Sequence, residues 1–347
     1  MESAAGAETE ALPFRTVGAR LGFVCEPEIY GPPHPRLPSP RPFGGRSGLF
    51  SSVVTRMLAA DGADSLLPAC LTQRTPASMT FTDKLRAAQA ATRSRLCVGL
   101  DPDPARFPAH LAADRGDAAV LTFNTAIIDA TEDLACAYKL NLAFYEALGP
   151  DGWRALADTI RAIPDERLVI LDGKRGDIGN TARRYAEGAF DRLGADACTV
   201  APYMGRDAIR PFLQHASRCA FVLVATSNES GPDLQQAEVD GQPFYRLVAQ
   251  LAVEEATKQP GEVGFVVGAT RPELLAELRA AYPDVPFLIP GVGTQGGDPD
   301  AVIAASGGGP TLVNSSRSIL YASAGADFAR AAREAAAALR AALGDPS

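Results

Sequence analysis

The sequence predicts a closed (β/α)8 barrel, with a short helix before the first strand and a disordered or irregular segment at the N-terminus. The main reason is that short apolar segments alternate eight times with amphipathic helical patterns over about 260 residues. Hydrophobic residues make up 46% of the 347-residue chain, which is enough to fill a large core. An open doubly wound sheet is the alternative fold, but no Gly-x-Gly-x-x-Gly motif follows the first strand.

Residues 1–78 have a different composition from the rest of the chain. Residues 31–42 are rich in proline and are followed by Gly44-Gly45, a pattern that does not form regular structure. No early apolar stretch indicates a secretory signal. We expect residues 1–78 to be a disordered extension, Met79 to be the biological start, and residues 79–347 to form the barrel.

The elements of the expected barrel follow from Met79 onward. A helix begins near Met79–Leu85, with Thr80 or Thr82 as its N-cap. Apolar runs of strand length predict strands at Leu96–Leu100, Ala137–Asn141, Leu168–Lys174, Ala197–Tyr203, Ala220–Ser227, Gly264–Ala269, Pro286–Val292 and Thr311–Ser315. Helical periodicity predicts helices at Val120–Leu134, Trp153–Ile163, Thr181–Leu193, Tyr245–Thr257, Arg271–Ala281 and Asp327–Leu343.

Composition excludes several classes of function. A net charge of -8 argues against binding to nucleic acid or to an anionic membrane, and no apolar run reaches transmembrane length. Four cysteines begin strand-like runs without a Cys-x-x-Cys pair, so we expect buried core thiols in a reducing cytoplasm and neither disulfides nor a metal site. None of the three histidines falls at a strand end, which leaves proton transfer to lysines and carboxylates.

Charged residues follow the first three predicted strands. Asp172 and Lys174 lie two residues apart on one strand, so both point to the same face, and Asp177 follows closely. Asp101 and Lys139 end the first and second strands. Buried charges are costly, so such a cluster indicates chemistry, although a solvated strand end is the alternative interpretation.

Glycines and an arginine follow the last two predicted strands. Gly291 and Gly293 end the seventh strand, and Arg317 follows the eighth. Glycine lets backbone N–H groups approach a phosphate, and arginine can bind it with two hydrogen bonds. Barrels often bind phosphate between these two loops, so we favour a phosphate site over a flexible turn with a surface arginine.

Taken together, these segments resemble the orotidine 5′-phosphate decarboxylase family, in its longer bacterial subgroup. The resemblance extends from about residue 79 to the C-terminus, and residues 1–78 have no counterpart in it. It is carried by Val98–Asp101, Tyr138–Asn141, Leu171–Thr181, Thr226-Ser227, Gly291–Gly297 and Asn314–Arg317.

The resemblance implies metal- and cofactor-independent decarboxylation of orotidine 5′-phosphate to uridine 5′-phosphate in pyrimidine synthesis, by a cytoplasmic homodimer. It implies that Lys174 stabilises the carbanion and gives its proton to C6, and that Asp172 lies near the substrate carboxylate. Lys139 would hold Asp172 and the ribose side of the network. Asp177 would enter the partner's site and complete an alternating Lys-Asp-Lys-Asp array.

The resemblance also implies the remaining substrate contacts. Asp101 would bind a ribose hydroxyl and Ser227 the pyrimidine, while Ile178 and Thr181 would line the partner's site. The phosphate would be held by Gly291, Gly293 and Arg317. Many relatives carry a glutamine on a longer loop after the seventh strand; here that segment is compact, and Gln295 is the nearest candidate.

Two other functions stay open on the sequence. A Mg²⁺-dependent sugar-phosphate decarboxylase or aldol-type synthase can share the Asp-x-Lys-x-x-Asp spacing and would use the same acids as metal ligands. A non-catalytic nucleotide-phosphate binder could keep the fold without turnover. Lys139, Ser227 and the Asp177-Ile178 pair favour the nucleotide decarboxylase.

Overall fold

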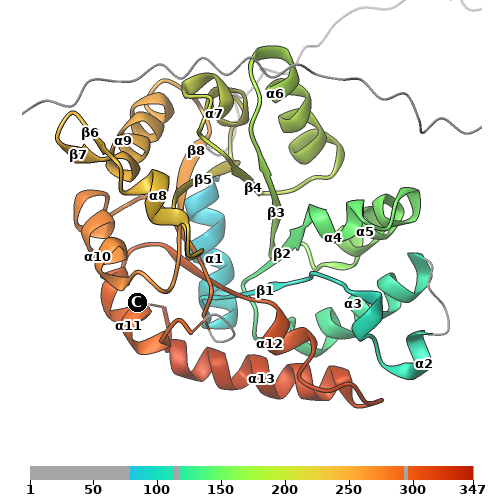
Figure 1. Ribbon diagram of the computed structural model, residues 1–347. Helices are drawn as coiled ribbons and strands as arrows, with labels where there is room; N and C mark the ends of the chain where they lie inside the picture. The colour runs from blue at the N-terminus through green and yellow to red at the C-terminus, as the bar shows by residue number, and fades with distance from the viewer. Residues whose placement is uncertain (1–78, 113–116, 293–295, 347) are drawn as a thin grey trace, which may run out of the picture. The chain divides into compact units, whose positions relative to one another are not determined.

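Eight parallel strands form a closed barrel in the computed structural model, which describes residues 79–112, 117–292 and 296–346 (Figure 1). The pairing of β10 with β1, in which Val98 lies opposite Ser315, closes the sheet and rules out the open alternative. The predicted (β/α)8 fold is therefore confirmed. In their order around the barrel, the strands are β1 (Leu96–Gly99), β2 (Ala137–Asn141), β3 (Leu168–Arg175), β4 (Ala197–Val200), β5 (Cys219–Ala225), β8 (Glu262–Val267), β9 (Phe287–Pro290) and β10 (Thr311–Ser315).

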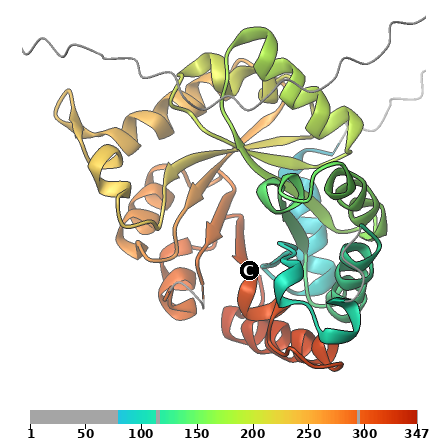
Figure 2. The same cartoon turned by 45° about the vertical axis from the view of Figure 1, so that its right-hand side comes forward.

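Helices surround the strands, as Figure 2 shows from a second direction. A two-stranded antiparallel sheet, β6 (Glu238–Val239) with β7 (Gln242–Pro243), lies apart from the barrel sheet. The helices are α1 (Phe81–Thr92), α2 (Ala109–Ala112), α3 (Asp117–Thr131), α4 (Leu142–Glu146), α5 (Pro150–Ala162), α6 (Gly179–Ala186), α7 (Arg206–Leu213), α8 (Gly231–Gln235), α9 (Phe244–Ala256), α10 (Pro272–Ala281), α11 (Pro299–Ser306), α12 (Arg317–Leu320) and α13 (Phe328–Leu343). A 3₁₀ turn, η1 (Pro104–Arg106), and a π-helix, η2 (Glu187–Arg192), complete the described helical segments.

Helix α1 (Phe81–Thr92) closes the N-terminal end of the barrel. Thr80 is its N-cap, as predicted, and forms a capping box with Asp83. Thr82 instead contacts β8, because its backbone N–H donates to Glu262 Oε1 at 3.1 Å. Phe81 is fully buried, and its ring meets that of Phe221 edge-on, 5.7 Å away, among the inward side chains of the strands.

Several predicted boundaries are wrong by a few residues. The fourth strand was expected to reach Tyr203 but ends at Val200, because the chain turns there and Gly205 adopts a φ of +80°. Tyr203 is consequently 77% exposed. The helix expected over Thr181–Leu193 is divided into α6 and the π-helical η2, where Leu193 N–H bonds to the Gly188 carbonyl five residues earlier.

The inward faces of the strands change character along the barrel. Near α1 they carry apolar groups such as Ala137, Ile170 and Ala197, whereas Lys139 and Asp172 lie two residues further along β2 and β3. Alternation along each strand thus places charged side chains at the C-terminal end of the barrel.

The other expectations can be compared with the described residues. Cys97, Cys136, Cys198 and Cys219 are buried and free, as predicted. Among the helices that the structure describes, none has the length and apolar character needed to cross a membrane. The expected extension, residues 1–78, lies outside the described residues.

Candidate active site

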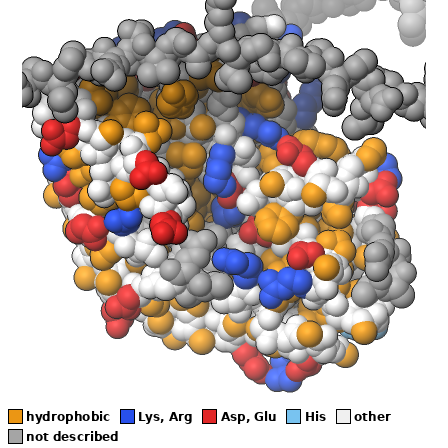
Figure 3. Space-filling view, viewed as in Figure 1, with side chains coloured by type: hydrophobic (Ala, Val, Ile, Leu, Met, Phe, Trp, Pro, Cys, Tyr) orange, Lys and Arg blue, Asp and Glu red, His pale blue; other side chains and the backbone are white. Residues whose placement is uncertain are grey.

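A cavity of about 520 Å³ lies at the C-terminal ends of the strands. Figure 3 shows a hollow on this face of the molecule, with positively and negatively charged side chains at its wall. Among the residues predicted for the site, the cavity is lined by Asp101, Lys139, Asp172, Lys174, Ser227, Gly291 and Arg317.

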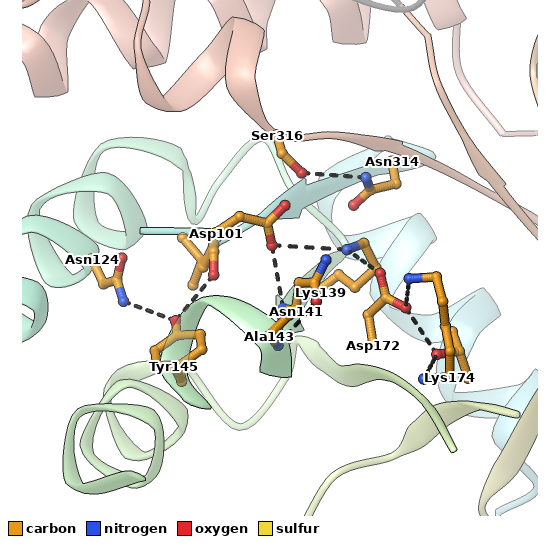
Figure 4. Close-up of polar contacts among 12 residues, drawn as sticks. Asp101, Asn124, Lys139, Asn141, Ala143, Tyr145, Asp172, Lys174, Asn314 and Ser316 are labelled. Atoms are coloured by element: carbon orange, nitrogen blue, oxygen red, sulfur yellow. Dashed lines mark hydrogen bonds and ion pairs between the residues drawn. The ribbon is translucent and has the colours of Figure 1, made fainter. Parts of the chain in front are cut away.

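Four charged side chains of alternating sign form a row beside this cavity (Figure 4). Lys139 Nζ lies 3.9 Å from Asp101 Oδ1 and 2.9 Å from Asp172 Oδ2. The other oxygen of Asp172, Oδ1, lies 2.7 Å from Lys174 Nζ. This row, defined as Asp101, Lys139, Asp172 and Lys174, is called the charged row below. Its inner members are buried, whereas the side chain of Lys174 is 50% exposed at the mouth.

Mutual attraction keeps Asp172 and Lys139 ionised inside the barrel. Burial alone would raise the pKa of Asp172, but the two neighbouring ammonium groups lower it to well below its usual value. Burial would likewise lower the pKa of Lys139, but Asp101 and Asp172 raise it above the usual lysine value. A carboxylate and an ammonium group thus remain charged in a place that water barely reaches.

The backbone around Asp101 is held by two tyrosines, of which Tyr145 is fully buried and Tyr321 partly buried. The Tyr321 hydroxyl donates to the Asp101 carbonyl at 3.0 Å and accepts from Asp103 N–H at 2.7 Å. The Tyr145 hydroxyl donates to the preceding carbonyl, that of Leu100, at 3.0 Å. The Asp101 carboxylate itself accepts from the backbone N–H of Asn141 at 3.2 Å. These bonds leave the acid little freedom to rotate away from Lys139.

The predicted residues after β3 do not line this cavity. Asp177 lies in the segment between β3 and α6, and its Oδ1 accepts from Ile178 N–H at 2.7 Å. Ile178 is 57% exposed, and Thr181 is exposed on α6. Gly293 and Gln295 lie outside the described residues. The described chain therefore brings together seven of the twelve predicted site residues around one cavity.

Several polar residues of the site were not predicted. Thr199 bonds to both Asp172 and Lys174, and Asn141, Thr226, Asn228 and Asn314 also line the cavity. Thr199 could have been found from alternation, because it is the second inward residue of a short strand that begins at Ala197. The others lie near strand ends, where sequence alone does not give side-chain direction.

Comparison with known proteins agrees with this geometry. The sequence model of the orotidine 5′-phosphate decarboxylase / HUMPS family matches residues 94–335. The chain belongs to this family. Its sequence is 52% identical to the orotidine 5′-phosphate decarboxylase of Herpetosiphon aurantiacus over 257 residues, which cover 74% of this chain and 95% of the relative. It is also 52% identical to that of Roseiflexus castenholzii over 269 residues, which cover 76% and 97%.

Solved structures of orotidine 5′-phosphate decarboxylases share the barrel. A putative orotidine-monophosphate-decarboxylase from Toxoplasma gondii has 39% sequence identity and a TM-score of 0.67, and the match covers 76% of this chain and 97% of that one. The OMP decarboxylase of Leishmania donovani has 39% identity and a TM-score of 0.65, with coverage of 76% and 99%. The similarity thus extends over nearly the full length of these enzymes.

Proposed function

We propose that this chain decarboxylates orotidine 5′-phosphate to uridine 5′-phosphate and CO₂, as a step of pyrimidine synthesis and without a metal or other cofactor. The observation that carries this proposal is the charged row at the mouth of the cavity, in a chain that belongs to the orotidine 5′-phosphate decarboxylase family. The relatives named above carry this activity in their names.

The charged row suits the chemistry of this reaction. When the bond between C6 and the carboxylate breaks, the electron pair stays on C6 in an orbital that the pyrimidine ring delocalises poorly. A positive charge fixed beforehand at C6 stabilises this pair without reorganisation. Lys174 Nζ, held by Asp172 at 2.7 Å, supplies such a charge and then transfers its proton to C6. The resulting amine regains a proton from solvent, to which the side chain is half exposed.

The other members of the row keep Lys174 in place. Asp172 faces the position proposed for the substrate carboxylate and is fixed through its second oxygen by Lys139. Asp101, on the far side of Lys139, is proposed to bind a ribose hydroxyl. Ser227 is proposed to bind the pyrimidine. Gly291 and Gly293, Gln295 and Arg317 are proposed to bind the phosphate, which would align the ring with Lys174.

The same row argues against the Mg²⁺-dependent alternative. Asp172, an acid of the Asp-x-Lys-x-x-Asp spacing that such an enzyme would use as a metal ligand, is already paired with two lysines. A divalent cation at Asp172 would face two ammonium groups at close range, and like charges repel strongly in a buried site. A non-catalytic binder is also disfavoured, because binding alone gives no reason to hold two lysines around a buried carboxylate.

The proposed enzyme is a cytoplasmic homodimer. Asp177, Ile178 and Thr181 do not line the cavity of their own chain, and Ile178 exposes a large apolar side chain next to Asp177. We propose that all three enter the site of a second copy, where Asp177 would extend the charged row beyond Lys174. This arrangement would explain why an apolar residue with 57% exposure lies beside a charged one.

The test is the loss of ultraviolet absorbance of orotidine 5′-phosphate with purified protein, measured with and without EDTA. We expect wild-type protein to be active and insensitive to EDTA, and Lys174→Ala to lose at least about 1,000-fold in kcat, because the charge opposite C6 is gone. Arg330→Ala, at an exposed ion pair on α13, is the matched control and should keep wild-type activity. Inactive wild-type protein with an intact fold would contradict the proposal.

A further inference from the structure

The pairing of β3 with β4 is irregular directly beside the charged row. Leu171 pairs with Cys198 and Arg175 pairs with Val200, so Asp172, Gly173 and Lys174 together lie opposite Thr199. Extra residues in one strand form a bulge, which leaves backbone groups without a partner in the sheet and redirects side chains. Asp172 and Lys174, within this bulge, both line the cavity.

The hydroxyl group of Thr199 accepts a hydrogen bond from the backbone of the bulge and donates another to the Asp172 side chain. The backbone N–H of Lys174 donates to Thr199 Oγ1 at 2.9 Å, in place of a carbonyl of β4. The same hydroxyl donates to Asp172 Oδ1, also at 2.9 Å. An amide N–H can only donate, so the single hydroxyl proton is left for the carboxylate and the direction of both bonds is fixed.

These bonds complete a closed ring around the reacting lysine. The ring runs from Lys174 N–H to Thr199 Oγ1, on to Asp172 Oδ1, and back to Lys174 Nζ, which lies 2.7 Å from Oδ1. The ring begins at the backbone of Lys174, whose φ is +44°. This left-handed conformation is unfavourable for residues that carry a Cβ atom. Thr199 is 2% exposed, and its branched side chain has little rotational freedom, so it is a rigid anchor for this ring.

We infer that Thr199 is a positioning residue of the decarboxylation site, and that its hydroxyl group sets where Lys174 Nζ lies relative to Asp172. The inference rests on the proposed function and adds a residue to it. Thr199 acts through its two neighbours and needs no contact with the substrate. Its loss should therefore affect the chemical step more than the binding of phosphate and ribose, which are held elsewhere in the cavity.

Two substitutions separate the hydroxyl group from the shape of the side chain. Thr199→Val keeps the branched shape and removes both hydrogen bonds, whereas Thr199→Ser keeps the hydroxyl. For Thr199→Val we expect kcat to fall about 10- to 100-fold and KM for orotidine 5′-phosphate to change less than about threefold, because a displaced reacting group slows the bound complex. Thr199→Ser should stay within about threefold of wild-type kcat.

Thr131→Val is the matched control. Thr131 is fully buried outside the cavity, and its hydroxyl also makes two bonds, at 2.7 Å to the Ile127 carbonyl and 3.0 Å to the Tyr138 hydroxyl. It reports the general effect of losing a buried hydroxyl group. We expect Thr131→Val to lower the melting temperature and to leave kcat unchanged.

The results decide the inference in each case. A Thr199→Val variant with wild-type kcat would overturn the inference. Equal losses of kcat in Thr199→Val and Thr199→Ser would also overturn it, because they would assign the effect to packing. If Thr199→Val does not fold, Thr199→Ala replaces it: a loss of kcat in Ala but not in Ser supports the inference, and wild-type kcat in Ala overturns it. An inactive wild-type protein would instead contradict the proposed function itself.

Discussion

Asp172 remains a carboxylate inside the barrel because each of its oxygens receives a charged donor. Oδ2 is paired with Lys139, and Oδ1 with Lys174 and the Thr199 hydroxyl. An isolated buried charge would instead take up or lose a proton, so the two signs stabilise each other only as a set. This interdependence makes the protonation of Asp172 measurable through the stability of the protein.

We expect the effect of Asp172→Asn on stability to depend on pH. The pKa of Asp172 is lowered in the folded protein, so its ionised form contributes to stability above the unfolded pKa, about 3.9, and this contribution is lost as the pH falls further. The difference in unfolding free energy between wild type and Asp172→Asn should be constant from about pH 5 to 8 and shrink toward about pH 3. Urea unfolding measures it.

Asp133→Asn is the control for that series, since Asp133 forms an exposed ion pair with Arg333. Exposed pairs contribute little, so this variant should stay within about 1 kcal/mol of wild type at every pH. A difference for Asp172→Asn that does not change between pH 8 and pH 3 would contradict the ionised, lysine-paired state of the carboxylate.

Among single residues, the charged ones were easier to predict than the residues that hold them in place. Asp172 and Lys174 stand out because charges two apart at the end of an apolar strand share a face. Thr199 and Tyr321 carry no such signal, since threonine and tyrosine are common in strands and cores. Tyr321 reaches the Asp101 carbonyl from 220 residues away, a contact that only the closed barrel creates.

Among the elements, α1 has a role separate from chemistry. Phe81 and Leu85 fill the N-terminal end of the barrel, whereas the charged row lies at the C-terminal end. Stability and activity should therefore respond to different substitutions, as is general for barrels of this kind.

We expect Phe81→Ala to lower the unfolding free energy by about 3–5 kcal/mol, because it leaves a cavity among buried side chains. KM for orotidine 5′-phosphate should remain within about twofold of wild type at a temperature where the variant is folded, since no element of the cavity is displaced. Denaturant unfolding and steady-state kinetics measure the two effects. Met79→Ala, at a half-exposed position before α1, should be nearly neutral.

Element identities were predicted better than element ends. The strand at Thr311–Ser315 and the one at Ala137–Asn141 match the structure, because both are apolar runs that end in polar residues. The fourth strand ends early at Val200, where Pro202 and Gly205 belong to a turn. The bulge in β3 is marked in the sequence only by Gly173, and its extent depends on pairing with β4.

For the whole molecule, the fold follows from the sequence and the assembly does not. Eight alternating strand and helix segments with right-handed crossovers leave few arrangements other than a barrel. The partner chain is not predicted in this way. Asp177 and Ile178 lie on a part of the surface that is outside the cavity of their own chain. Mixing of subunits tests whether a second copy covers it.

We expect Lys174→Ala and Asp177→Ala to be nearly inactive alone and to regain activity when they are mixed and allowed to exchange subunits. In a mixed dimer one site would lack both groups and the other would have both, so an equimolar mixture should reach about one quarter of wild-type kcat. Steady-state assays before and after exchange measure the gain. A mixture that stays inactive despite exchange, confirmed with differently tagged subunits, would contradict the shared site.

The closed N-terminal end of the barrel also governs how products depart. Phe81 and its neighbours fill that end of the barrel. The substrate nucleotide therefore enters, and both products leave, through the mouth of the cavity beside Lys174. Carbon dioxide formed in this cavity leaves through the same mouth as the nucleotide. Among the described residues, the same mouth thus serves entry of the substrate and departure of both products, so the site is free for the next turnover only once the nucleotide has left.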